Sequence, residues 1–390
     1  MTPVIIFLGF FVYSVSVTIF GTLASAIMDT TALPLSQMGS LLSILQAGAF
    51  LGIILSPVVL KRLKEASILR LGVIVMGLAL GTLVFFPSKS MLFVIFACLG
   101  FGGFYVDSGS NAYLAGRFPD KRSTYIPILH FVYSLGALTS GYLILPFKGP
   151  SWHFGYAICG FLLLMLLLVG LQRDKGSLKG QQEIQDQHEN REKLPAKVIL
   201  RNKRFLLYCL VLMLYMASQQ TCTSWLPLYI ETSFHATPSM VAATMMSFWV
   251  GIACMRLIAP VLLHRGLHPL LLTAGGMALS FVALCGALLS PNVAIAYGAI
   301  ALSGFGAGAT IPLFIVEASS WFPANTAFVS VFYILCGTLG RMVFPYLVAI
   351  IAESYSLKLA LLLSSLLLLL GFLLSVNVYR AGRSSGESQP

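Results

Sequence analysis

The feature that most constrains this chain is a series of long apolar segments that recurs along nearly its whole length. Each segment has about 20 residues, the length that an α-helix needs to cross the hydrocarbon core of a bilayer. Hydrophobic residues make up 58% of the 390-residue sequence and charged residues only 9%, whereas a soluble domain carries roughly 25% charged residues. The segments are continuous rather than alternating, which argues against the strands of a membrane β-barrel. The sequence therefore predicts an all-α, multi-pass membrane protein.

Twelve such segments can be marked, six on each side of one long polar stretch. The predicted spans are residues 3–28, 38–60, 68–86, 91–114, 125–145 and 152–171, followed by 205–230, 240–263, 269–289, 293–318, 327–351 and 357–379. The first span lacks the basic region of a signal peptide and is too long for one, so it is predicted to be a helix of the protein.

The polar stretch "RDKGSLKGQQEIQDQHENREKLPAKVILRNKR" divides the chain. It is rich in Gln, Glu, Lys and Asp and poor in aromatic residues, which favours a flexible or surface-lying linker. We therefore expect an N-terminal six-helix bundle over residues 1–172, a linker over 173–204, a C-terminal six-helix bundle over 205–380 and a tail over 381–390.

Lys and Arg are concentrated in every second loop, which sets the expected orientation in the membrane. They follow the second, fourth, sixth and last spans, whereas the alternate loops hold few charges. By the positive-inside rule both termini and the linker are predicted to be cytoplasmic, in the plasma or inner membrane. The formal net charge of +11 then reflects topology. A nucleic-acid partner is not expected, because such binding needs basic residues gathered on one folded face with interleaved aromatics.

The seven cysteines all fall within the apolar spans, with no CxxC motif and no histidine spacing for a metal. They are expected to behave as small apolar residues, and neither a metal nor a cofactor is predicted. An intramembrane hydrolase would need a Ser–His pair or two aspartates, and Asp107 has no second buried acid at helical spacing. We therefore do not expect an enzyme.

The two halves of the sequence repeat each other. The segment "GFGGFYVDSGSNAYLAGRFP" from Gly100 aligns without gaps with "GFGAGATIPLFIVEASSWFP" from Gly304, and "SPVVLKR" from Ser56 aligns with "APVLLHR" from Ala259. Small residues alone can reflect helix packing in membranes. One constant offset across two helices and their loop, however, indicates a duplication.

Two sets of six helices, a polar cytoplasmic linker and parallel halves resemble the major facilitator superfamily of secondary transporters. The usual loop signature of that superfamily, G-x-x-x-D-R-x-G-R-R, is degraded here to "SPVVLKRLKEASILR", with the acidic residue displaced to Glu65. The resemblance implies twelve transmembrane helices in two pseudo-symmetric six-helix bundles that transport a small solute by alternating access. We expect the protein to act as a monomer in the lipid bilayer.

Asp107 is the one carboxylate predicted to lie well inside a span, with Asn111 four residues later on the same helix face. A charge inside the bilayer costs several kcal/mol on most estimates, so Asp107 should face a cavity, pair with a cation or stay protonated. The alternative is a structural carboxylate that only fixes helix packing through hydrogen bonds to neighbouring helices.

Four other polar side chains interrupt the apolar spans. Arg341 lies near mid-span and is predicted to line a cavity or pair with an acid. Arg256 and Glu317 lie toward the predicted cytoplasmic side, where snorkelling or solvation explains them, and they are interpreted as gating or structural charges. His130 follows the Asp107 helix directly, so it either lines the same cavity or is a satisfied hydrogen-bonding group within the bundle.

The seventh span contains "YMASQQTCTSWLPLY", which places Gln219, Gln220 and neighbouring hydroxyls beside Trp225. Amides and hydroxyls next to an aromatic ring suit a polyhydroxylated ligand, with hydrogen bonds to its hydroxyls and stacking on its apolar face. We expect these residues to approach the solute from the C-terminal bundle. The same groups equally suit hydrogen bonds between helices.

At these residues the chain resembles a narrower group, the fucose permease and glucose/mannose:proton symporters. The group has G-x-G-x-x-x-x-[DE]-x-x-x-N in its fourth helix, and Asp107 and Asn111 fall on its acidic and asparagine positions. The resemblance implies a proton-coupling or sugar-contacting carboxylate. Two features depart from it: Gln219 stands where many members carry glutamate, and the Asn-Asp pair of fucose permease has no counterpart near Gly21.

The expected function is proton-coupled symport of a sugar or similar small polar solute. One alternative is proton-driven efflux of a drug or amphiphilic metabolite. The 27 Phe and 14 Met could line an apolar pocket for such a substrate, but the antiporter-type G-x-x-x-G-P-x-x-G-G is not found in the fifth span. A second alternative is a membrane sensor or scaffold that transports nothing.

Overall fold

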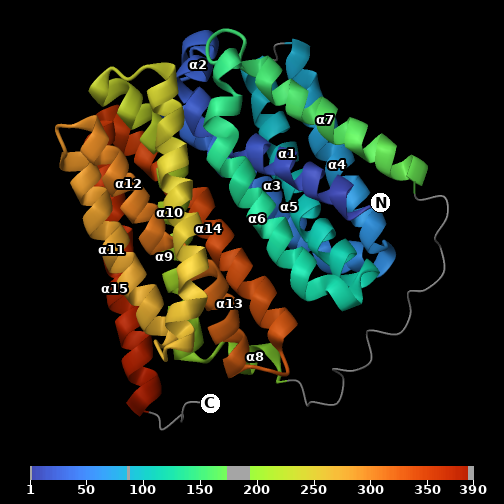
Figure 1. Cartoon of the computed structure of the whole chain (residues 1–390), viewed down its shortest axis with the longest axis vertical. Helices are drawn as coiled ribbons and strands as arrows, with labels where there is room; N and C mark the ends of the chain where they lie inside the picture. Colours follow the sequence, from blue (N-terminus) through green and yellow to red (C-terminus); the bar gives the residue numbers. More distant parts are fainter. Residues whose placement is uncertain (1, 86–87, 174–193, 385–390) are drawn as a thin grey trace. The chain divides into compact units, whose positions relative to one another are not determined.

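The computed structural model describes residues 2–85, 88–173 and 194–384, and no strand occurs among them (Figure 1). In chain order the α-helices are α1 (Pro3–Thr18), α2 (Phe20–Thr31), α3 (Leu35–Arg62), α4 (Glu65–Gly81), α5 (Lys89–Arg117), α6 (Arg122–Leu143), α7 (Trp152–Arg173), α8 (Ala196–Ile199), α9 (Lys203–Phe234), α10 (Pro238–His264), α11 (Pro269–Leu289), α12 (Val293–Ala307), α13 (Thr310–Trp321), α14 (Thr326–Ser354) and α15 (Leu357–Ser384). Short 3₁₀ turns follow α4, α5 and α6: η1 (Thr82–Phe85), η2 (Pro119–Lys121) and η3 (Leu145–Phe147).

By length and hydropathy, the described residues contain 11 helices able to cross a membrane, or 12 spans if the bent pair α1–α2 forms one. α12 and α13 together make one of these spans, Val293–Trp321. The prediction of an all-α, multi-pass membrane protein is confirmed. Most helices extend a few residues beyond the predicted spans, because hydropathy ends at the first charged residue whereas the helix continues toward water. α15, for example, runs past the predicted start of the tail to Ser384.

The first predicted span is not one helix. α1 and α2 meet at Ile19 with a bend of 50°. Just before the bend, the Ser16 hydroxyl donates to the Val12 carbonyl and the Thr18 hydroxyl to the Ser14 carbonyl, each at 2.7 Å. Hydroxyls that bond to the preceding turn compete with the helical ladder and bend helices. The cause was present in the sequence, but a hydropathy profile does not report it.

The tenth predicted span is also interrupted, at Gly308 and Ala309 between α12 and α13. The Tyr215 hydroxyl on α9 donates to the Ala307 carbonyl at 2.7 Å. A side chain that takes a carbonyl out of the backbone ladder is a recognised cause of a break. This contact is tertiary, so local sequence cannot predict it.

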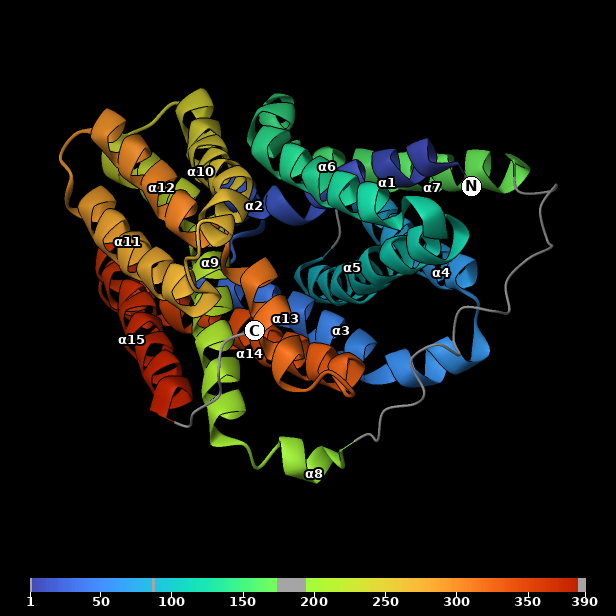
Figure 2. The same ribbon diagram turned by 60° about the horizontal axis from the view of Figure 1, so that its bottom comes forward.

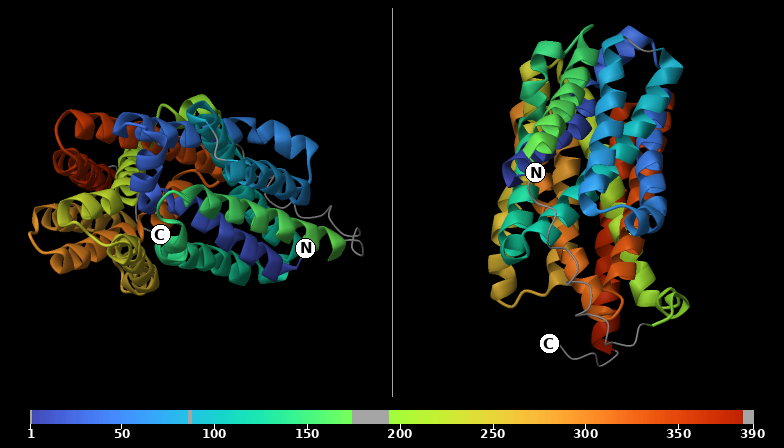
Figure 3. Two further views of the ribbon diagram at one scale, coloured as in Figure 1. Left: turned by 90° about the horizontal axis from the view of Figure 1, so that it is seen from above. Right: turned by 90° about the vertical axis from the view of Figure 1, so that its right-hand side faces the viewer.

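The structure divides into two compact units. The first comprises Met1–Gln185 and Leu226–Met246, and the second comprises Asp186–Trp225 and Ser247–Pro390. Within the first unit α5 packs on α3 and α4, the blue and cyan helices of Figure 3. Within the second unit α11 packs on both α12 and α15, as Figure 2 shows. α9 and α10 thus contribute to both units. The predicted bundle and linker boundaries stay predictions, and residues 174–193 of the linker lie outside the described residues.

Glycines bring helix backbones into contact at matching positions of the two units. The contacting pairs are Gly48 with Ala97 and Gly100 with Leu45 in the first unit, and Gly251 with Ala301 and Gly304 with Phe248 in the second. At each glycine a β-carbon would overlap the carbonyl oxygen of its partner, so a larger residue is excluded. Gly251 and Gly304 stand 203 and 204 residues after Gly48 and Gly100. The sequence repeat therefore reflects a repeated helix–helix contact, α3 with α5 and α10 with α12.

The last part of the predicted linker is folded against the second unit. α8 buries Ile199 fully in the same apolar cluster as Phe205 and Tyr208. The Asn325 side chain exchanges two hydrogen bonds with the Leu194 backbone, each at 3.0 Å. The apolar segment "AKVIL" explains this docking, because it interrupts the polar composition on which the linker prediction was based.

Candidate functional site

Asp107 lies near the middle of α5, on the same helix face as Gly103 and Asn111. The Asn111 side-chain amide donates to the Asp107 carboxylate (Nδ2–Oδ1 3.0 Å) and to the Asp107 backbone carbonyl (3.0 Å). Both side chains are half-buried. The two predicted site residues of α5 are therefore brought together, with the carboxylate held by a neutral donor and still partly accessible.

An aromatic group on α1 and α6 adjoins this face of α5. It consists of Phe10, Tyr13, His130 and Tyr133, with Phe10 as its buried centre: the Phe10 ring lies 5.4 Å from Tyr13, 5.8 Å from Tyr133 and 6.2 Å from His130. Tyr13 packs on Gly103, where a β-carbon would lie 3.1 Å from its Cε2 atom. His130, an exposed residue, contacts Phe10, and Phe10 contacts Tyr13, which packs on Gly103 one helical turn from Asp107.

The polar segment of α9 is divided between the surface and the interior of the second unit. Gln219 lines a small internal pocket together with Ser218, Phe248 and Ser303. Gln220 donates to the Ser224 hydroxyl at 3.0 Å. Both amides, which we name the glutamine pair, are half-buried rather than fully enclosed. Their role as solute ligands stays a prediction.

Trp225 occupies a different environment. Its ring is fully buried, and its indole N–H donates to the Pro345 carbonyl on α14 at 3.1 Å. In this structure the ring offers no open face on which a ligand could stack. The indole instead ties α9 to α14 through this hydrogen bond.

Arg341 lies at the centre of the Phe328–Ser354 span of α14 and is half-buried. Its Nη2 atom makes one long contact with the Thr338 hydroxyl, at 3.5 Å. Its Nε atom is buried and has no hydrogen-bond partner among the described residues. Arg341 thus lies at mid-span, without an acidic partner in the described part of its own unit. That it lines a cavity or pairs with an acid stays a prediction.

The two other predicted charges lie nearer the helix ends. Arg256 is eight residues before the end of α10, about two helical turns. Glu317 accepts a hydrogen bond from the Trp321 indole at 3.2 Å, and the Arg204 guanidinium lies over that indole ring at 4.2 Å. These contacts connect Glu317, through the Trp321 ring, to Arg204 at the start of α9. The gating role of either residue stays a prediction.

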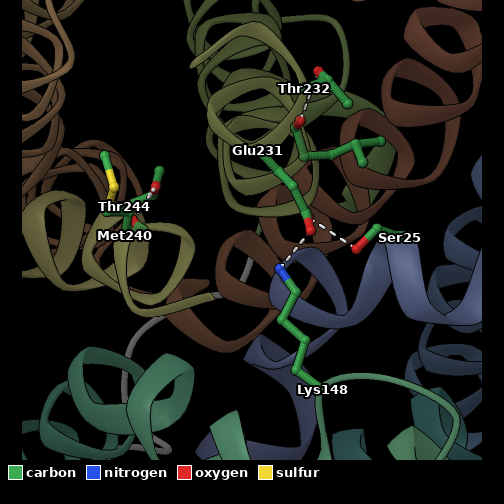
Figure 4. Close-up of polar contacts among 7 residues, drawn as sticks. Ser25, Lys148, Glu231, Thr232, Met240 and Thr244 are labelled. Carbon is green, nitrogen blue, oxygen red and sulfur yellow. Dashed lines mark hydrogen bonds and ion pairs between the residues drawn. The ribbon is translucent and has the colours of Figure 1, made fainter. Parts of the chain in front are cut away.

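Sequence reasoning missed one ionic cluster in the first unit, shown in Figure 4. The Lys148 ammonium lies 2.8 Å from one Glu231 carboxylate oxygen, and the Ser25 hydroxyl donates to the other oxygen at 2.8 Å. Only 7% of the Lys148 side chain and 24% of the Glu231 side chain are exposed. The residues come from α2, the connection before α7 and the last part of α9. Nothing in a single sequence links positions so far apart.

A chain of transmembrane helices with repeated halves and a carboxylate at mid-span is typical of a secondary transporter. The model of one protein family, described as Major Facilitator Superfamily, matches residues 6–318. The chain belongs to the major facilitator superfamily. As a member, it is a multi-pass membrane transporter of small solutes that works by alternating access, and it is not an enzyme. The predicted superfamily is thus confirmed, whereas the narrower likeness to fucose permease stays a prediction.

Individual members of the superfamily are similar over almost the whole chain. A TsgA homolog of Buchnera aphidicola subsp. Baizongia pistaciae (strain Bp) is 22% identical over 93% of this chain and 91% of that protein. A bacterial homologue of the human lysosomal transporter Spinster, inward-facing and occupied, superposes with a TM-score of 0.81 at 13% identity, covering 97% and 96% of the two chains. The nucleoside transporter NupG gives 0.74 at 14% identity, covering 97% and 99%. The two structures show the shared fold.

Proposed function

We propose that this transporter is a proton-coupled symporter of a sugar or similar small polar solute, with Asp107 as its proton-carrying group. The observation that carries the proposal is the half-buried Asp107 carboxylate near the middle of α5, bonded to Asn111 at 3.0 Å. A charged carboxylate in a membrane span costs several kcal/mol, and proton uptake removes that cost. Proton binding is thereby coupled in energy to any step that encloses Asp107.

Asn111 suits both protonation states of its partner. Its N–H can donate to a carboxylate oxygen or to the carbonyl oxygen of the protonated acid, so this hydrogen bond survives protonation. The new carboxyl O–H can then donate to a solute hydroxyl. Protonation therefore removes the charge of Asp107 and adds a donor for the solute, and it leaves no buried polar group of the pair without a hydrogen bond.

The proposed solute-binding residues are Asn111 and His130 in the first unit, and the glutamine pair and Arg341 in the second. Each is at least partly accessible, and together they offer amide, imidazole and guanidinium groups. The half-buried Tyr13 and Tyr133 rings add a surface for the apolar face of a cyclic solute. Trp225 is left out, because its ring is fully buried.

The proposed direction is import across the plasma or inner membrane, with both termini cytoplasmic. The positive-inside distribution supports this orientation: Arg117, Lys121 and Arg122 lie together at the turn between α5 and α6. Proton-driven efflux uses the same carboxylate in an antiport cycle. Symport and efflux differ in one observable result. Under an inward proton gradient, a symporter fills the vesicles with solute, whereas an antiporter empties them.

The test is uptake into proteoliposomes under an inward proton gradient, with radiolabelled D-glucose, D-galactose, D-glucuronate, D-galacturonate and uridine as probes. We expect the wild type to accumulate at least one probe. Asp107→Asn should abolish that accumulation but retain part of the exchange at equal concentrations, which needs no net proton movement. The matched control is Asp29→Asn, because Asp29 is an exposed acid near the end of α2. Normal pH-driven accumulation by Asp107→Asn would contradict the proposal.

A further inference from the structure

Two contacts fix the register of α9 against α14 within the second unit. The Phe205 and Phe332 rings lie 5.8 Å apart. About two helical turns farther along both helices, a β-carbon added at Gly340 would overlap the Met213 carbonyl oxygen, so the two backbones touch there. Each contact joins residues whose numbers differ by 127. The two helices therefore run in the same direction, side by side, with a constant offset.

Cys209 and Cys336 have the same offset and lie midway between these two contacts. Each cysteine is one turn from the ring contact and one turn from the glycine contact, on the helix face that meets the other helix. Both belong to one apolar cluster of the second unit, and the Cys209 thiol donates a hydrogen bond to the Cys336 sulfur. The register and the hydrogen bond thus agree that the two sulfur atoms are neighbours.

Other cysteines of the chain have different surroundings. Three of them hydrogen-bond to serine side chains, namely Cys159, Cys222 and Cys285. Cys254 is the exposed member of the seven, whereas Cys336 is half-buried and Cys209 is buried. An oxidant that followed exposure alone would therefore modify Cys254, and an oxidant whose product needs a second thiol would modify the α9–α14 pair.

We propose that Cys209 and Cys336 form a redox modification site, at which hydrogen peroxide converts the two thiols into a disulfide that ties α9 to α14. The more accessible Cys336 reacts first: its sulfur attacks one peroxide oxygen, the O–O bond breaks, and hydroxide leaves with the thiol proton as water, which gives a sulfenic acid. The Cys209 sulfur then attacks the Cys336 sulfur. The S–O bond breaks, and hydroxide leaves with the Cys209 proton as a second water. The two thiols lose two electrons, and the peroxide gains them.

The position of the pair suits a reversible modification. Cys209 lies six residues, about 9 Å, from the start of α9 at Lys203, which is the cytoplasmic end in the predicted orientation. Disulfides in a reducing cytosol are usually transient and redox-sensing. The disulfide would fix the register of the two helices that carry the glutamine pair and Arg341, so it should slow transport. This consequence rests on the proposed function, whereas formation of the disulfide does not.

The test counts thiols in the purified full-length protein before and after treatment with hydrogen peroxide, by maleimide labelling of the denatured chain and mass spectrometry. We expect the seven free thiols to fall to five, and one disulfide-linked peptide pair to contain Cys209 and Cys336. Dithiothreitol should restore all seven. The crosslink restricts the unfolded chain, so it should also raise the melting temperature by about 5 °C or more.

Cys336→Ser and Cys254→Ser are the matched variants. After peroxide, Cys336→Ser should give no linked peptide and no rise in melting temperature, whereas Cys254→Ser should form the same disulfide as the wild type. Three results would overturn the site: thiol loss at Cys254 alone, a linked peptide that joins other cysteines, or no loss that dithiothreitol reverses. The wild-type count needs no variant, so a folding defect in Cys336→Ser does not remove the test.

The effect on transport is measured in proteoliposomes with a probe solute that the reduced wild type exchanges. Oxidation should slow that exchange by about tenfold or more, because conformational steps set many turnover rates, and dithiothreitol should restore it. An exchange rate that oxidation leaves unchanged would overturn the control of transport. Failure of the reduced wild type to exchange any probe would instead contradict the proposed function, and the thiol count would still decide whether the modification site exists.

Discussion

The repeated glycine contacts allow a quantitative test of the packing. Gly72 on α4 faces α5, and a β-carbon there would lie 2.6 Å from the Val106 backbone nitrogen, whereas ordinary contacts begin at 3.4 Å. In Gly72→Ala the two backbones must therefore separate by about 0.8 Å, because neither atom belongs to a flexible side chain. A gap of that size removes about a quarter to a half of the attractive energy of each van der Waals contact between the two helices. Overpacking of this kind typically costs about 1–3 kcal/mol.

The control is a neighbouring pair of glycines in the second unit. Gly276 matches Gly72 in the repeat and meets the Gly306 backbone, whereas a β-carbon at Gly275 would meet nothing within 4 Å. Gly275→Ala should stabilise its helix by about 0.5–1 kcal/mol, since glycine is a weaker helix former than alanine. Gly276→Ala gains the same propensity but loses the backbone contact, so it should behave like Gly72→Ala.

The measurement is the free energy of unfolding in mixed micelles, with circular dichroism as the probe. We expect Gly72→Ala and Gly276→Ala to lie about 1–3 kcal/mol below Gly275→Ala. Equal unfolding free energies for Gly275→Ala and Gly276→Ala would refute the inference that these glycines are required by close backbone approach. A loss in one unit alone would refute the equivalence of the two repeated contacts.

Three further outcomes follow from individual contacts. Changing either Lys148 or Glu231 to alanine should destabilise the protein by about 1–3 kcal/mol, because the remaining charge is mostly buried and unpaired, and a double-mutant cycle should show that the two losses are not additive. Trp225→Phe should lower the unfolding free energy by about 1 kcal/mol through loss of its hydrogen bond while solute binding stays within twofold; a binding loss without destabilisation would restore it as a ligand contact. Single cysteines should be labelled from the cytoplasm at Lys121 and from outside at Asn292, and the reverse pattern would overturn the orientation.

Hydropathy was sufficient to predict the helices of this fold, because a membrane span needs a long run of apolar residues whatever it packs against. It did not predict where helices break. The bend at Ile19 depends on hydroxyls that bond to the preceding turn, and the break at Gly308 depends on the Tyr215 hydroxyl reaching from another helix. The first cause is local but invisible to an average over 20 residues, and the second is tertiary.

The candidate site divides in the same way. Asp107 and Asn111 were predictable as a pair, since helical spacing alone places them together. The buried position of Trp225 was not predictable. The seventh span carries polar and aromatic residues on more than one face, and composition does not say which face meets a neighbouring helix. The Lys148–Glu231 ion pair joins distant segments, and each residue by itself resembled an ordinary loop charge.

The central claim, that Asp107 carries the coupled proton, is tested most directly by following the proton itself. Proteoliposomes loaded with the pH indicator pyranine are given a solute that stabilises the purified protein, without any imposed gradient. The account predicts that solute entry acidifies the lumen of wild-type and Asp29→Asn vesicles, and that Asp107→Asn vesicles show no acidification although solute exchange continues. Acidification by Asp107→Asn at the wild-type rate would contradict the account, because another group would then be carrying the proton.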